Sequence, residues 1–444
     1  MAPTDALPSH PACAPQAAVV HPAGPGGGAR VFLFLQGPIS PFFSELGAAL
    51  RGAGHTVHRV NLCLGDKLFW RIGGAVDYRG KPEDWPGWID RFLAEERVTD
   101  IVLLGERRDY HRAAIAAAAA RGIAVTVTDF GYLRPDWITL ERDGMAGGSR
   151  FPRDPAAIRA VAAGLPVPDL SARYRDSFAT QATWDMIYHF ATMLPWPFRH
   201  YRSHQLLHPL VMYAGTSRRV WLKRWENART AETLARLAQN RTPYWLFAMQ
   251  METDFSIRAY SPYPDLDTPI RETVRSFAAH APAAAHLLVK VHPLDPCVKN
   301  WRRRIARIAE AAGIPGRVHY LPGGVLDQIL YGAKGLVTVN STAGMHALQL
   351  DVPLKVLGDA VYDVPGLAFQ GPLDRFWSAG RQPDPTLRDD FLTAMTATIQ
   401  IRGVYYNRVG LDAAVAAAAE RLSAGLINLP LPRERHFPAD PAQS

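Results

Sequence analysis

The chain has 444 residues, 48% of them apolar, which is enough for more than one hydrophobic core and suggests two domains. Its 3 cysteines, Cys13, Cys63 and Cys297, match neither a zinc motif nor a disulfide framework, so we expect inert thiols in a reducing cytoplasm rather than a disulfide-stapled secreted domain. The formal net charge of +8 favours an acidic partner such as an anionic lipid surface, a nucleotide or a polyanionic glycan.

The first residues differ in composition from the rest of the chain. Residues 1–29 are rich in Pro, Ala and Gly and lack the basic start and continuous apolar core of a signal peptide, which predicts a disordered leader. No apolar run in the sequence reaches the ~18 residues that a membrane-spanning helix needs. The sequence therefore predicts a protein that at most lies on a membrane surface.

Strands and helices alternate after the leader. An apolar strand at 30–35 ends at Gln36-Gly37-Pro38, and a helix at 42–53 follows. The predicted strands that continue the pattern are 55–62, 100–104 and 124–128, and the predicted helices are 85–96 and 111–121. Strict alternation predicts a parallel, doubly wound sheet. The turn after the first strand has no G-x-G-x-x-G, so we expect no dinucleotide in this half.

Two loops crowded with aromatic and charged residues follow strands of this half, at 65–80 and 129–137. The second loop holds Tyr132, Arg134 and Asp136. Loops at the carboxyl ends of strands commonly carry function, so these two predict one face of a cleft. A purely structural stack of Trp on Arg is the alternative for the second loop.

The segment 181–240 is predicted to be helical and mixes aromatic with basic residues. Such a mixture suits an interface with anionic headgroups, whereas a solvated helical face is the plainer alternative. The residues that we assign to a membrane surface are Trp196, Arg199, Arg202, Lys223 and Arg224. Nucleic acid is disfavoured as a partner because no nucleic-acid-binding motif is present.

A second alternating unit begins at 243. Its predicted strands are 244–249, 286–292, 318–321, 335–339 and 354–357, and its predicted helices are 268–280, 301–312 and 326–331, with a polar loop at 251–265. One alanine-rich helix at 389–426 is predicted to run back across both domains. The fold class that follows is α/β, with two Rossmann-like domains in a GT-B-type glycosyltransferase architecture. The predicted divisions are 1–29 leader, 30–180 first domain, 181–240 connector, 241–380 second domain and 381–444 C-terminal helices.

Polar residues follow two strands of the second unit. Lys290 and His292 leave the strand at 286–292, and Asn340, Ser341 and Thr342 lie where a helix begins after 335–339. Because the carboxyl ends of parallel strands share one edge, these groups predict a phosphate pocket at the start of a helix, with Gly344 allowing another backbone to approach the first turn. Simple capping of the helix by Ser341 is the alternative.

Several motifs occur together in this chain. They are LQGPISPFF at 35–43, GYLRPDW at 131–137, MQMETD at 249–254, KVHPLD at 290–295, and VTVNSTAGMHAL at 337–348 followed by PLKVLGDAVYDVPGL. This set resembles the bacterial capsule polysaccharide proteins of the KpsS and LipB type, which are related to KpsC, from about 31 to beyond 405. The resemblance implies a retaining β-Kdo transferase that uses CMP-Kdo and adds the first Kdo to a phosphatidylglycerol lipid at the cytoplasmic face of the inner membrane.

The resemblance also implies roles for individual residues. Retention by two inversions needs a carboxylate nucleophile, for which Asp254 matches the acidic position of the family and Glu252 is the local rival. His292 would assist the departing phosphate, and Lys290 would neutralise it. The nucleotide-binding set is Lys290, His292, Asn340, Ser341, Thr342 and Gly344, and the acceptor-binding set is Gln36, Gly37, Tyr132, Arg134 and Asp136.

Metal and cofactors are not expected, and the donor CMP-Kdo is a substrate. A single sugar-linked phosphate leaves, so no diphosphate calls for a divalent ion, and Asp265-Leu266-Asp267 is read as a helix start. Another CMP-sugar transferase of the sialyl type is one alternative function. A non-catalytic capsule assembly or export scaffold is the other, and the resemblance also suggests other capsule assembly proteins as partners.

Overall fold

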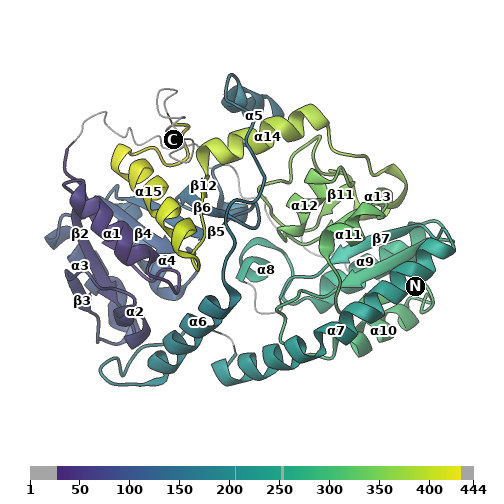
Figure 1. The fold of residues 1–444 in the computed structure, drawn as a ribbon, viewed down its shortest axis with the longest axis horizontal. Coiled ribbons are helices and arrows are strands. Elements are labelled where there is room, and N and C mark those ends of the chain that lie inside the picture. The colour runs from purple at the N-terminus through teal and green to yellow at the C-terminus, as the bar shows by residue number, and fades with distance from the viewer. Residues whose placement is uncertain (1–27, 206, 252–254, 432–444) are drawn as a thin grey trace, which may run out of the picture.

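The protein consists of two α/β lobes lying side by side, which a long helical connector joins along one edge (Figure 1). A computed structural model describes residues 28–205, 207–251 and 255–431. Within these ranges the strands form one seven-stranded sheet and one five-stranded sheet. The prediction of an α/β protein with two Rossmann-like halves is confirmed, whereas the domain limits taken from the sequence stay predictions.

The first sheet has the strand order β12-β6-β5-β4-β1-β2-β3. Its strands are β1 (Val31–Phe34), β2 (Thr56–Asn61), β3 (Ala75–Asp77), β4 (Asp100–Leu104), β5 (Ala124–Phe130), β6 (Trp137–Arg142) and β12 (Gln400–Arg402). The strands from β5 to β3 are parallel, β6 is antiparallel to β5, and β12 is antiparallel to β6. The sequence did not predict β3, β6 or β12. The expectation of an all-parallel sheet is wrong at the edge formed by β6 and β12, whereas β3 extends the other edge in parallel.

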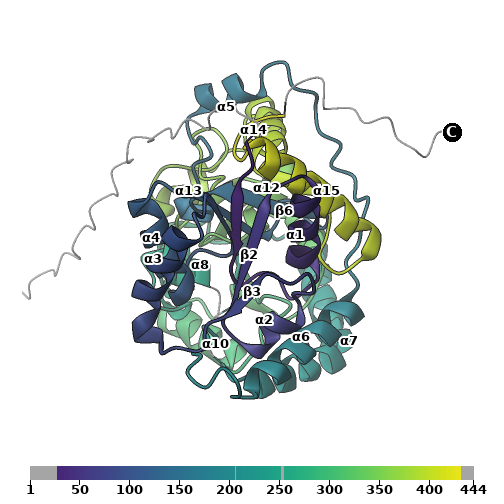
Figure 2. The ribbon, with the colours of Figure 1, turned by 90° about the vertical axis from the view of Figure 1, so that its left-hand side faces the viewer.

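Helices cover both faces of the first sheet (Figure 2). Helices α1 (Phe42–Gly52) and α15 (Arg408–Ala424) bury residues such as Leu46 and Leu411 on one face. On the other face, α3 (Trp85–Glu95) and α4 (Asp109–Ala120) bury Ile89 and Ala114. The strands between them are apolar on both sides, which is why they appear in the sequence as short continuous apolar runs.

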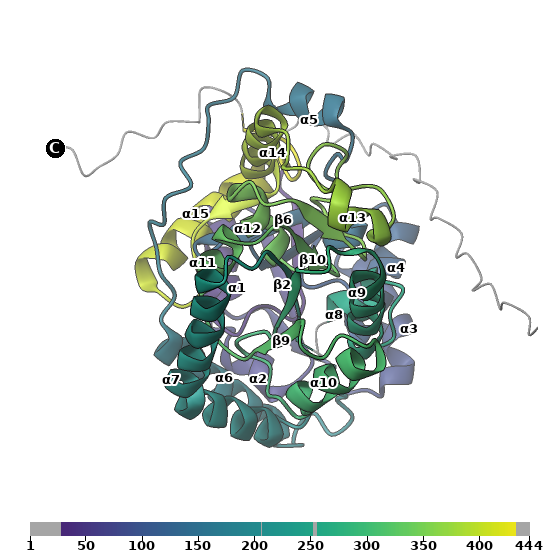
Figure 3. The ribbon, with the colours of Figure 1, turned by 90° about the vertical axis from the view of Figure 1, so that its right-hand side faces the viewer.

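The second sheet is parallel throughout, in the order β11-β10-β7-β8-β9. Its strands are β7 (Tyr244–Ala248), β8 (His286–Lys290), β9 (Val318–Leu321), β10 (Leu336–Thr338) and β11 (Leu354–Val356). Figure 3 shows α7 on one side of this sheet and α9 and α10 on the other. The helices around it are α7 (Pro209–Gln239), α8 (Phe255–Tyr260), α9 (Asp267–His280), α10 (Trp301–Ala311), α11 (Leu326–Tyr331), α12 (Ala343–Gln349) and α13 (Leu373–Ala379).

The start of α9 explains the acidic triplet in the sequence. Asp265 Oδ1 accepts hydrogen bonds from Thr268 N at 2.9 Å and Thr268 Oγ1 at 2.8 Å, so it caps the first turn. Asp267 forms ion pairs with Lys299 at 3.2 Å and Arg304 at 2.9 Å. Asp265 therefore serves the helix start that the sequence predicted, and Asp267 ties that start to α10 and the residues before it.

The single helix predicted at 389–426 is wrong. The chain forms α14 (Pro385–Thr398), then β12, then α15. Two local features break the helix: β12 pairs with β6, and Gly403 has φ 149°, where a Cβ would lie 2.6 Å from the Ala414 Cβ. The alanine-rich composition concealed this strand, but the tail does return to the first sheet, as a GT-B-type architecture requires.

Asp136, predicted to bind an acceptor, is instead a structural tie between distant segments. Its fully buried carboxylate accepts hydrogen bonds from Arg402 Nη1 at 3.0 Å, Arg173 N at 2.7 Å and Tyr174 N at 3.1 Å. The Arg402 guanidinium also stacks on Trp137, 4.1 Å from its ring centroid. A structural Trp–Arg stack, the alternative for the loop, is thus present, although its arginine comes from β12 rather than from the loop. Both oxygens of the buried Asp136 carboxylate serve the fold.

Replacing Asp136 by Ala should therefore destabilise the first domain. The change leaves Arg402 and two backbone amides without their acceptor, and we expect a loss of about 3 kcal/mol in the free energy of unfolding. Asp169→Ala is the matched control, because Asp169 pairs with Arg173 on the surface, where water screens the pair, and the loss of stability should be much smaller. Urea unfolding followed by tryptophan fluorescence measures both, and equal losses would contradict the structural role of Asp136.

Candidate active site where the two domains meet

Tyr260, at the end of α8, connects the carboxyl edges of the two sheets. Arg107 follows β4 of the first sheet, donates from Nε to the Tyr260 hydroxyl at 3.1 Å, and lies 4.5 Å from the centroid of its ring. The Tyr260 carbonyl accepts from Asn340 Nδ2 at 3.2 Å and from Asp359 N at 2.7 Å. The loops after β4 and β10 are thus tied through one residue, as a site shared by two domains requires.

Asn340 is held by a reciprocal pair of hydrogen bonds with Gln250. The Gln250 amide donates to Asn340 Oδ1 at 2.8 Å, and Asn340 N donates to Gln250 Oε1 at 3.3 Å. Gln250 is buried and lies two residues after Ala248, the last residue of β7. These bonds fix the ends of β7 and β10 relative to each other, so the Asn340 side chain positions the loop that carries Ser341 and Thr342.

Ser341 and Thr342 form the start of α12. Ser341 Oγ accepts from Ala343 N at 3.2 Å, and the carbonyls of Ser341 and Thr342 accept from Gly344 N at 2.9 Å and Met345 N at 3.0 Å. Thr342 is the N-cap residue of α12 and makes no side-chain capping bond, so Ser341 stabilises the turn just before the helix rather than capping it. Both residues are half-buried at the carboxyl edge of β10.

Gly344 is needed because an aromatic ring lies against it. A Cβ at this position would be 2.3 Å from Cε2 of Tyr362, and the Tyr362 hydroxyl donates to the Ser341 carbonyl. The expectation that another backbone approaches this turn is wrong, since a side chain fills the space. Tyr362 lies in one of the sequence motifs quoted above, but no spacing rule assigns it a role.

Lys290 and His292 are separated by one residue in the sequence but lie in different surroundings. Lys290 is buried, donates from Nζ to the Val291 carbonyl at 3.4 Å, and has Arg219 and Glu226 of α7 nearby. Burial, together with the positive charge of Arg219, lowers the pKa of Lys290 to about 8. His292 is half-buried in the turn after β8, where Nδ1 accepts from Leu294 N at 3.2 Å.

The two predicted catalytic carboxylates, Asp254 and Glu252, lie outside the described residues. Gln250 before them and Tyr260 after them are the groups whose contacts tie the two domains. The assignment of Asp254 as the nucleophile, with Glu252 as its rival, stays a prediction.

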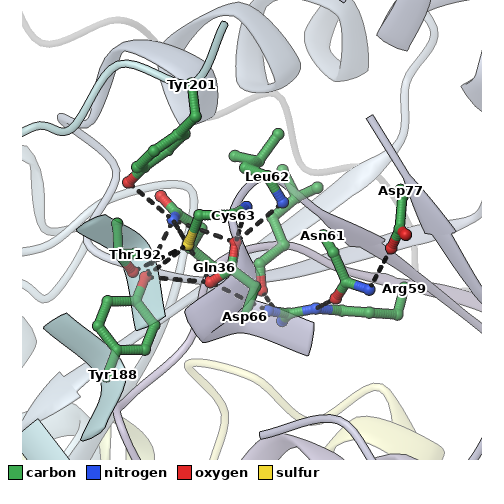
Figure 4. Close-up of polar contacts among 11 residues, drawn as sticks. Gln36, Arg59, Asn61, Leu62, Cys63, Asp66, Asp77, Tyr188, Thr192 and Tyr201 are labelled. Carbon is green, nitrogen blue, oxygen red and sulfur yellow. Dashed lines mark hydrogen bonds and ion pairs between the residues drawn. The ribbon is translucent and has the colours of Figure 1, made fainter. Parts of the chain in front are cut away.

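Gln36, predicted to bind an acceptor, lies at the centre of a buried polar network (Figure 4). Its amide nitrogen lies 3.2 Å from Asp66 Oδ2, 3.2 Å from the Tyr188 hydroxyl and 3.2 Å from the Tyr201 hydroxyl. Asp66 also accepts from Leu62 N at 2.9 Å. The Gln36 amide therefore joins β1 to α2 (Leu64–Leu68), to α6 (Phe178–Met193) and to the segment that carries Tyr201.

This network fixes α6 against the first domain. The Tyr188 hydroxyl donates to Asp66 Oδ1 at 3.1 Å, and its ring lies so close to Gly65 that a Cβ there would be 2.6 Å away. Arg59 pairs with Asp66 at 3.4 Å with both side chains buried. Burial raises the pKa of the Cys63 thiol to about 12, which keeps the thiol neutral, as an inert cysteine requires.

The other predicted acceptor residues differ in how many of their groups are used in contacts within the protein. Tyr132 donates to Glu141 Oε1 at 2.7 Å and accepts from Ala146 N at 2.7 Å. Gly37 leaves room for the ring of Phe43, which a Cβ would approach to 2.3 Å. Arg134 is an exposed residue overall, but its guanidinium lies over Phe130, 4.9 Å from the ring centroid, and burial of that group lowers its pKa.

Two buried carboxyl groups of the first domain were not predicted. Glu106 follows β4 and accepts weakly from Met145 N at 3.5 Å, and burial raises its pKa. Glu141 lies on β6, and burial raises its pKa to about 8. The position of Glu106 at the carboxyl end of an apolar strand is a signal that could have identified it, whereas Glu141 lies in a strand that the sequence did not predict.

The residues assigned to a membrane surface lie on the connector and are exposed. Trp196, Arg199 and Arg202 follow α6, and Lys223 and Arg224 lie on α7. Arg202 pairs with Glu83 at 3.0 Å. Among the helices that the structure describes, none is both long and apolar enough to cross a bilayer.

Comparison with known proteins identifies the family. The family model described as capsule polysaccharide biosynthesis protein matches residues 99–406, which include the Gln250–Asn340 pair and Tyr260. The chain belongs to this family. It is 33% identical to the capsule polysaccharide export protein KpsS of Escherichia coli, over 85% of this chain and 97% of that protein. It is 29% identical to the capsule polysaccharide modification protein LipB of Neisseria meningitidis serogroup A, over 86% of this chain and 93% of that protein.

A comparison with solved structures gives a more distant likeness. The β-Kdo 2,7 transferase of Thermosulfurimonas dismutans KpsC matches with a TM-score of 0.41 and 11% identity, over 88% of this chain and 99% of that one. The resemblance to capsule proteins of the KpsS and LipB type is confirmed by the family model and by the two sequence relatives.

The pKa of Lys290 leads to a test of its role toward a phosphate. If its ammonium attracts the phosphate of CMP, affinity should fall on the order of tenfold between pH 7 and pH 9.5, because the lysine loses its charge as pH rises through about 8. The phosphate keeps its charge over that range. Calorimetric titration with CMP measures this, and Lys290→Met should bind weakly with a flat pH profile. Identical profiles for the two proteins would contradict the role.

Proposed function

We propose that this protein is a retaining β-Kdo glycosyltransferase that moves Kdo from CMP-Kdo to a phosphatidylglycerol-type lipid and so starts the linker of a capsular polysaccharide. The observation that carries the proposal is the connection between the carboxyl edges of two α/β domains through Tyr260, Gln250 and Asn340, in a chain of the capsule polysaccharide biosynthesis family. Ligands of open α/β sheets bind at such edges. The resemblance of the sequence motifs supports the choice of donor and acceptor.

The second domain would bind the donor. Ser341 and Thr342 would hold the cytidylyl phosphate with the backbone amides at the start of α12, on a loop that the Gln250–Asn340 pair keeps in place. Lys290 would reduce the negative charge of the phosphate from the α7 side, and His292 would donate a hydrogen bond or a proton to it. One phosphate leaves with the cytidine, so the chemistry does not demand a divalent metal.

The reaction would proceed by two inversions at the anomeric carbon. An Asp254 oxygen attacks that carbon, and its bond to the CMP oxygen breaks, with the electron pair leaving on CMP. The acceptor hydroxyl oxygen then attacks from the other face, its proton passes to a base, and the carboxylate of Asp254 is restored. Glu252 is the rival for the nucleophile.

The first domain would bind the acceptor, with Arg134 as the cation for its anionic group. The buried hydrogen bonds of Gln36 stabilise the carboxyl edge of the first sheet, where the acceptor would bind. The hydrogen bond of Tyr132 to Glu141 and the packing of Phe43 on Gly37 stabilise the same edge. The exposed aromatic and basic residues of the connector fit a peripheral position at the cytoplasmic face of the inner membrane, where a phosphatidylglycerol acceptor is found.

An assay with purified protein tests the proposed function directly. We expect transfer of Kdo from CMP-Kdo to phosphatidylglycerol vesicles, detected as a mass increase of the lipid, and no transfer from CMP-sialic acid. Transfer from CMP-sialic acid alone would indicate a sialyl-type enzyme. A protein that neither binds CMP nor transfers a sugar would support the assembly or export scaffold.

Asp254→Asn tests the nucleophile. The amide keeps the size and polarity of the side chain but removes the attacking charge, so turnover should fall by about three orders of magnitude or more while CMP binding survives. His292→Ala should instead lose both transfer and part of the CMP affinity. Mass spectrometry of the intact wild-type protein with CMP-Kdo and no acceptor should reveal a Kdo adduct that is absent in Asp254→Asn. Near-normal turnover in a folded Asp254→Asn protein would eliminate this residue as nucleophile.

Removing the basic residues of the connector tests the membrane position. Replacing Arg199, Arg202, Lys223 and Arg224 together by Ala should weaken binding to anionic vesicles by nearly three orders of magnitude at low salt, because each cation near a headgroup surface contributes roughly 1 kcal/mol. The remaining binding should also depend less on salt. Vesicle sedimentation over a salt series measures both effects, and unchanged binding at low salt would contradict the membrane position.

A further inference from the structure

We propose that the outer face of α6, the segment after it and α7 insert apolar side chains into an anionic bilayer, while a basic pocket beside them binds the phosphate of one lipid headgroup. This surface is called the docking edge below. The proposal rests on the proposed function, in which the acceptor is a membrane lipid, and it names the side chains that enter the lipid and a headgroup site in the first domain.

The outer face of α6 carries an apolar stripe exposed to solvent. Met186, Ile187, Phe190 and Met193 are between 43% and 50% exposed, and they recur at the spacing that places side chains on one helix face. The stripe continues beyond the helix with Leu194 at 58% and Trp196 at 70%. Such a stripe normally faces a core, and a contiguous exposed one marks an interaction surface.

The orientation of this stripe is fixed by the opposite face of α6. Tyr188 and His189 are buried there, Tyr188 through its bonds to Asp66 and His189 through Tyr213, whose hydroxyl lies 2.8 Å from His189 Nδ1. The Tyr213 hydroxyl also donates to Asp185 at 2.8 Å, so α6 and α7 are joined by polar contacts. A rotation of α6 that buried its apolar stripe would break these bonds.

The first half of α7 extends the same edge with aromatic and basic residues. Trp221 is 82% exposed and Trp225 is 72% exposed, and the exposed cations Arg218, Lys223 and Arg224 lie among them. Figures 1 and 2 both place α6 and α7 next to each other along one edge of the molecule. Trp beside Arg and Lys is typical of helices that lie at a bilayer surface, since the rings enter the interface and the cations meet lipid phosphates.

A basic pocket follows the apolar stripe along the chain, three residues after Trp196. It has a volume of about 470 Å³ and lies between the short helix Pro82–Asp84 and the segment that follows Trp196. Its basic lining residues are Lys81, Arg199, His200 and Arg202, and its single carboxylate, Glu83, is paired with Arg202. The excess of positive charge in a cavity of this size suits a phosphate headgroup.

The pocket backs onto the interior of the first domain. Tyr201, which lines it, reaches Gln36 through its hydroxyl at 3.2 Å and stacks on Tyr110 with ring centroids 5.9 Å apart. A lipid whose phosphate occupies the pocket would therefore lie beside the carboxyl edge of β1, with its acyl chains along the stripe of α6. The charge of the edge favours an anionic bilayer as occupant over a second copy of this basic chain.

Apolar-to-charged variants test the insertion of α6. Ile187→Asp combined with Phe190→Asp should weaken binding to vesicles of equal parts phosphatidylglycerol and phosphatidylcholine at least about tenfold, because aspartate on a lipid-facing site opposes insertion. Val167→Asp is the control, since Val167 is exposed in the segment after α5 (Pro155–Ala162), outside the docking edge. Binding of the double variant equal to that of wild type would overturn the proposal.

Charge-matched variants test the pocket. Lys81→Ala combined with Arg199→Ala should reduce binding to the anionic vesicles about tenfold, whereas Arg302→Ala combined with Arg303→Ala, on the exposed face of α10, removes the same charge and should have little effect. Equal losses for the two pairs would show that net charge alone acts, which would overturn the headgroup site.

Further measurements separate this proposal from its competitors. Circular dichroism and CMP titration show whether each variant is folded. A change from dimer to monomer in Ile187→Asp with Phe190→Asp, measured by light scattering, would show that the stripe is an interface between copies and would overturn bilayer docking. Vesicle binding is measured without CMP-Kdo, so the result does not depend on whether the protein transfers Kdo. Transfer of Kdo to a soluble acceptor can likewise be measured in a protein that does not bind vesicles.

Discussion

The connection between the two sheets depends on the contacts of one residue, Tyr260. Its ring and hydroxyl are engaged by Arg107 of the first domain, and its carbonyl is engaged by Asn340 and Asp359 of the second. Parallel strands deliver their following loops to one edge, so a single contact at that edge brings functional loops of both domains together. The Gln250–Asn340 pair then fixes the loop that would hold a phosphate, and the rest of the proposed donor site depends on that geometry.

Buried hydrogen bonds of the first domain hold the helices that carry its exposed docking edge. Most of the polar residues near its carboxyl edge are committed to internal contacts: Gln36 to Asp66, Tyr188 and Tyr201, Tyr132 to Glu141, and Asp136 to Arg402. These bonds hold α6 and the tail against the sheet, so the exposed residues of the docking edge lie on a fixed surface. Acceptor recognition therefore depends on a surface whose shape is set by buried polar networks.

Much of the fold could be predicted from the sequence, because buried parallel strands are short apolar runs; β4, β9 and α11 were predicted with the limits they have. The errors arose where tertiary pairing overrides local composition: β6 and β12 pair at the sheet edge, and β12 divides what looked like one alanine-rich helix. At the site, residue type located Asn340 and Ser341 at a strand end but could not reveal that Tyr362 fills the space over Gly344 or that Asp136 is fully buried. Those facts depend on partners distant in sequence.

The central claim is that the nucleotide of the donor binds at the carboxyl edge of the second sheet, on the loops that follow β8 and β10. A crystal structure of the protein with CMP tests this most directly. The account predicts density for the cytidylyl phosphate against Ser341, Thr342 and the start of α12, with His292 within hydrogen-bonding reach. Nucleotide density at the carboxyl edge of the first sheet instead, beside Gln36 and Glu106, would contradict it.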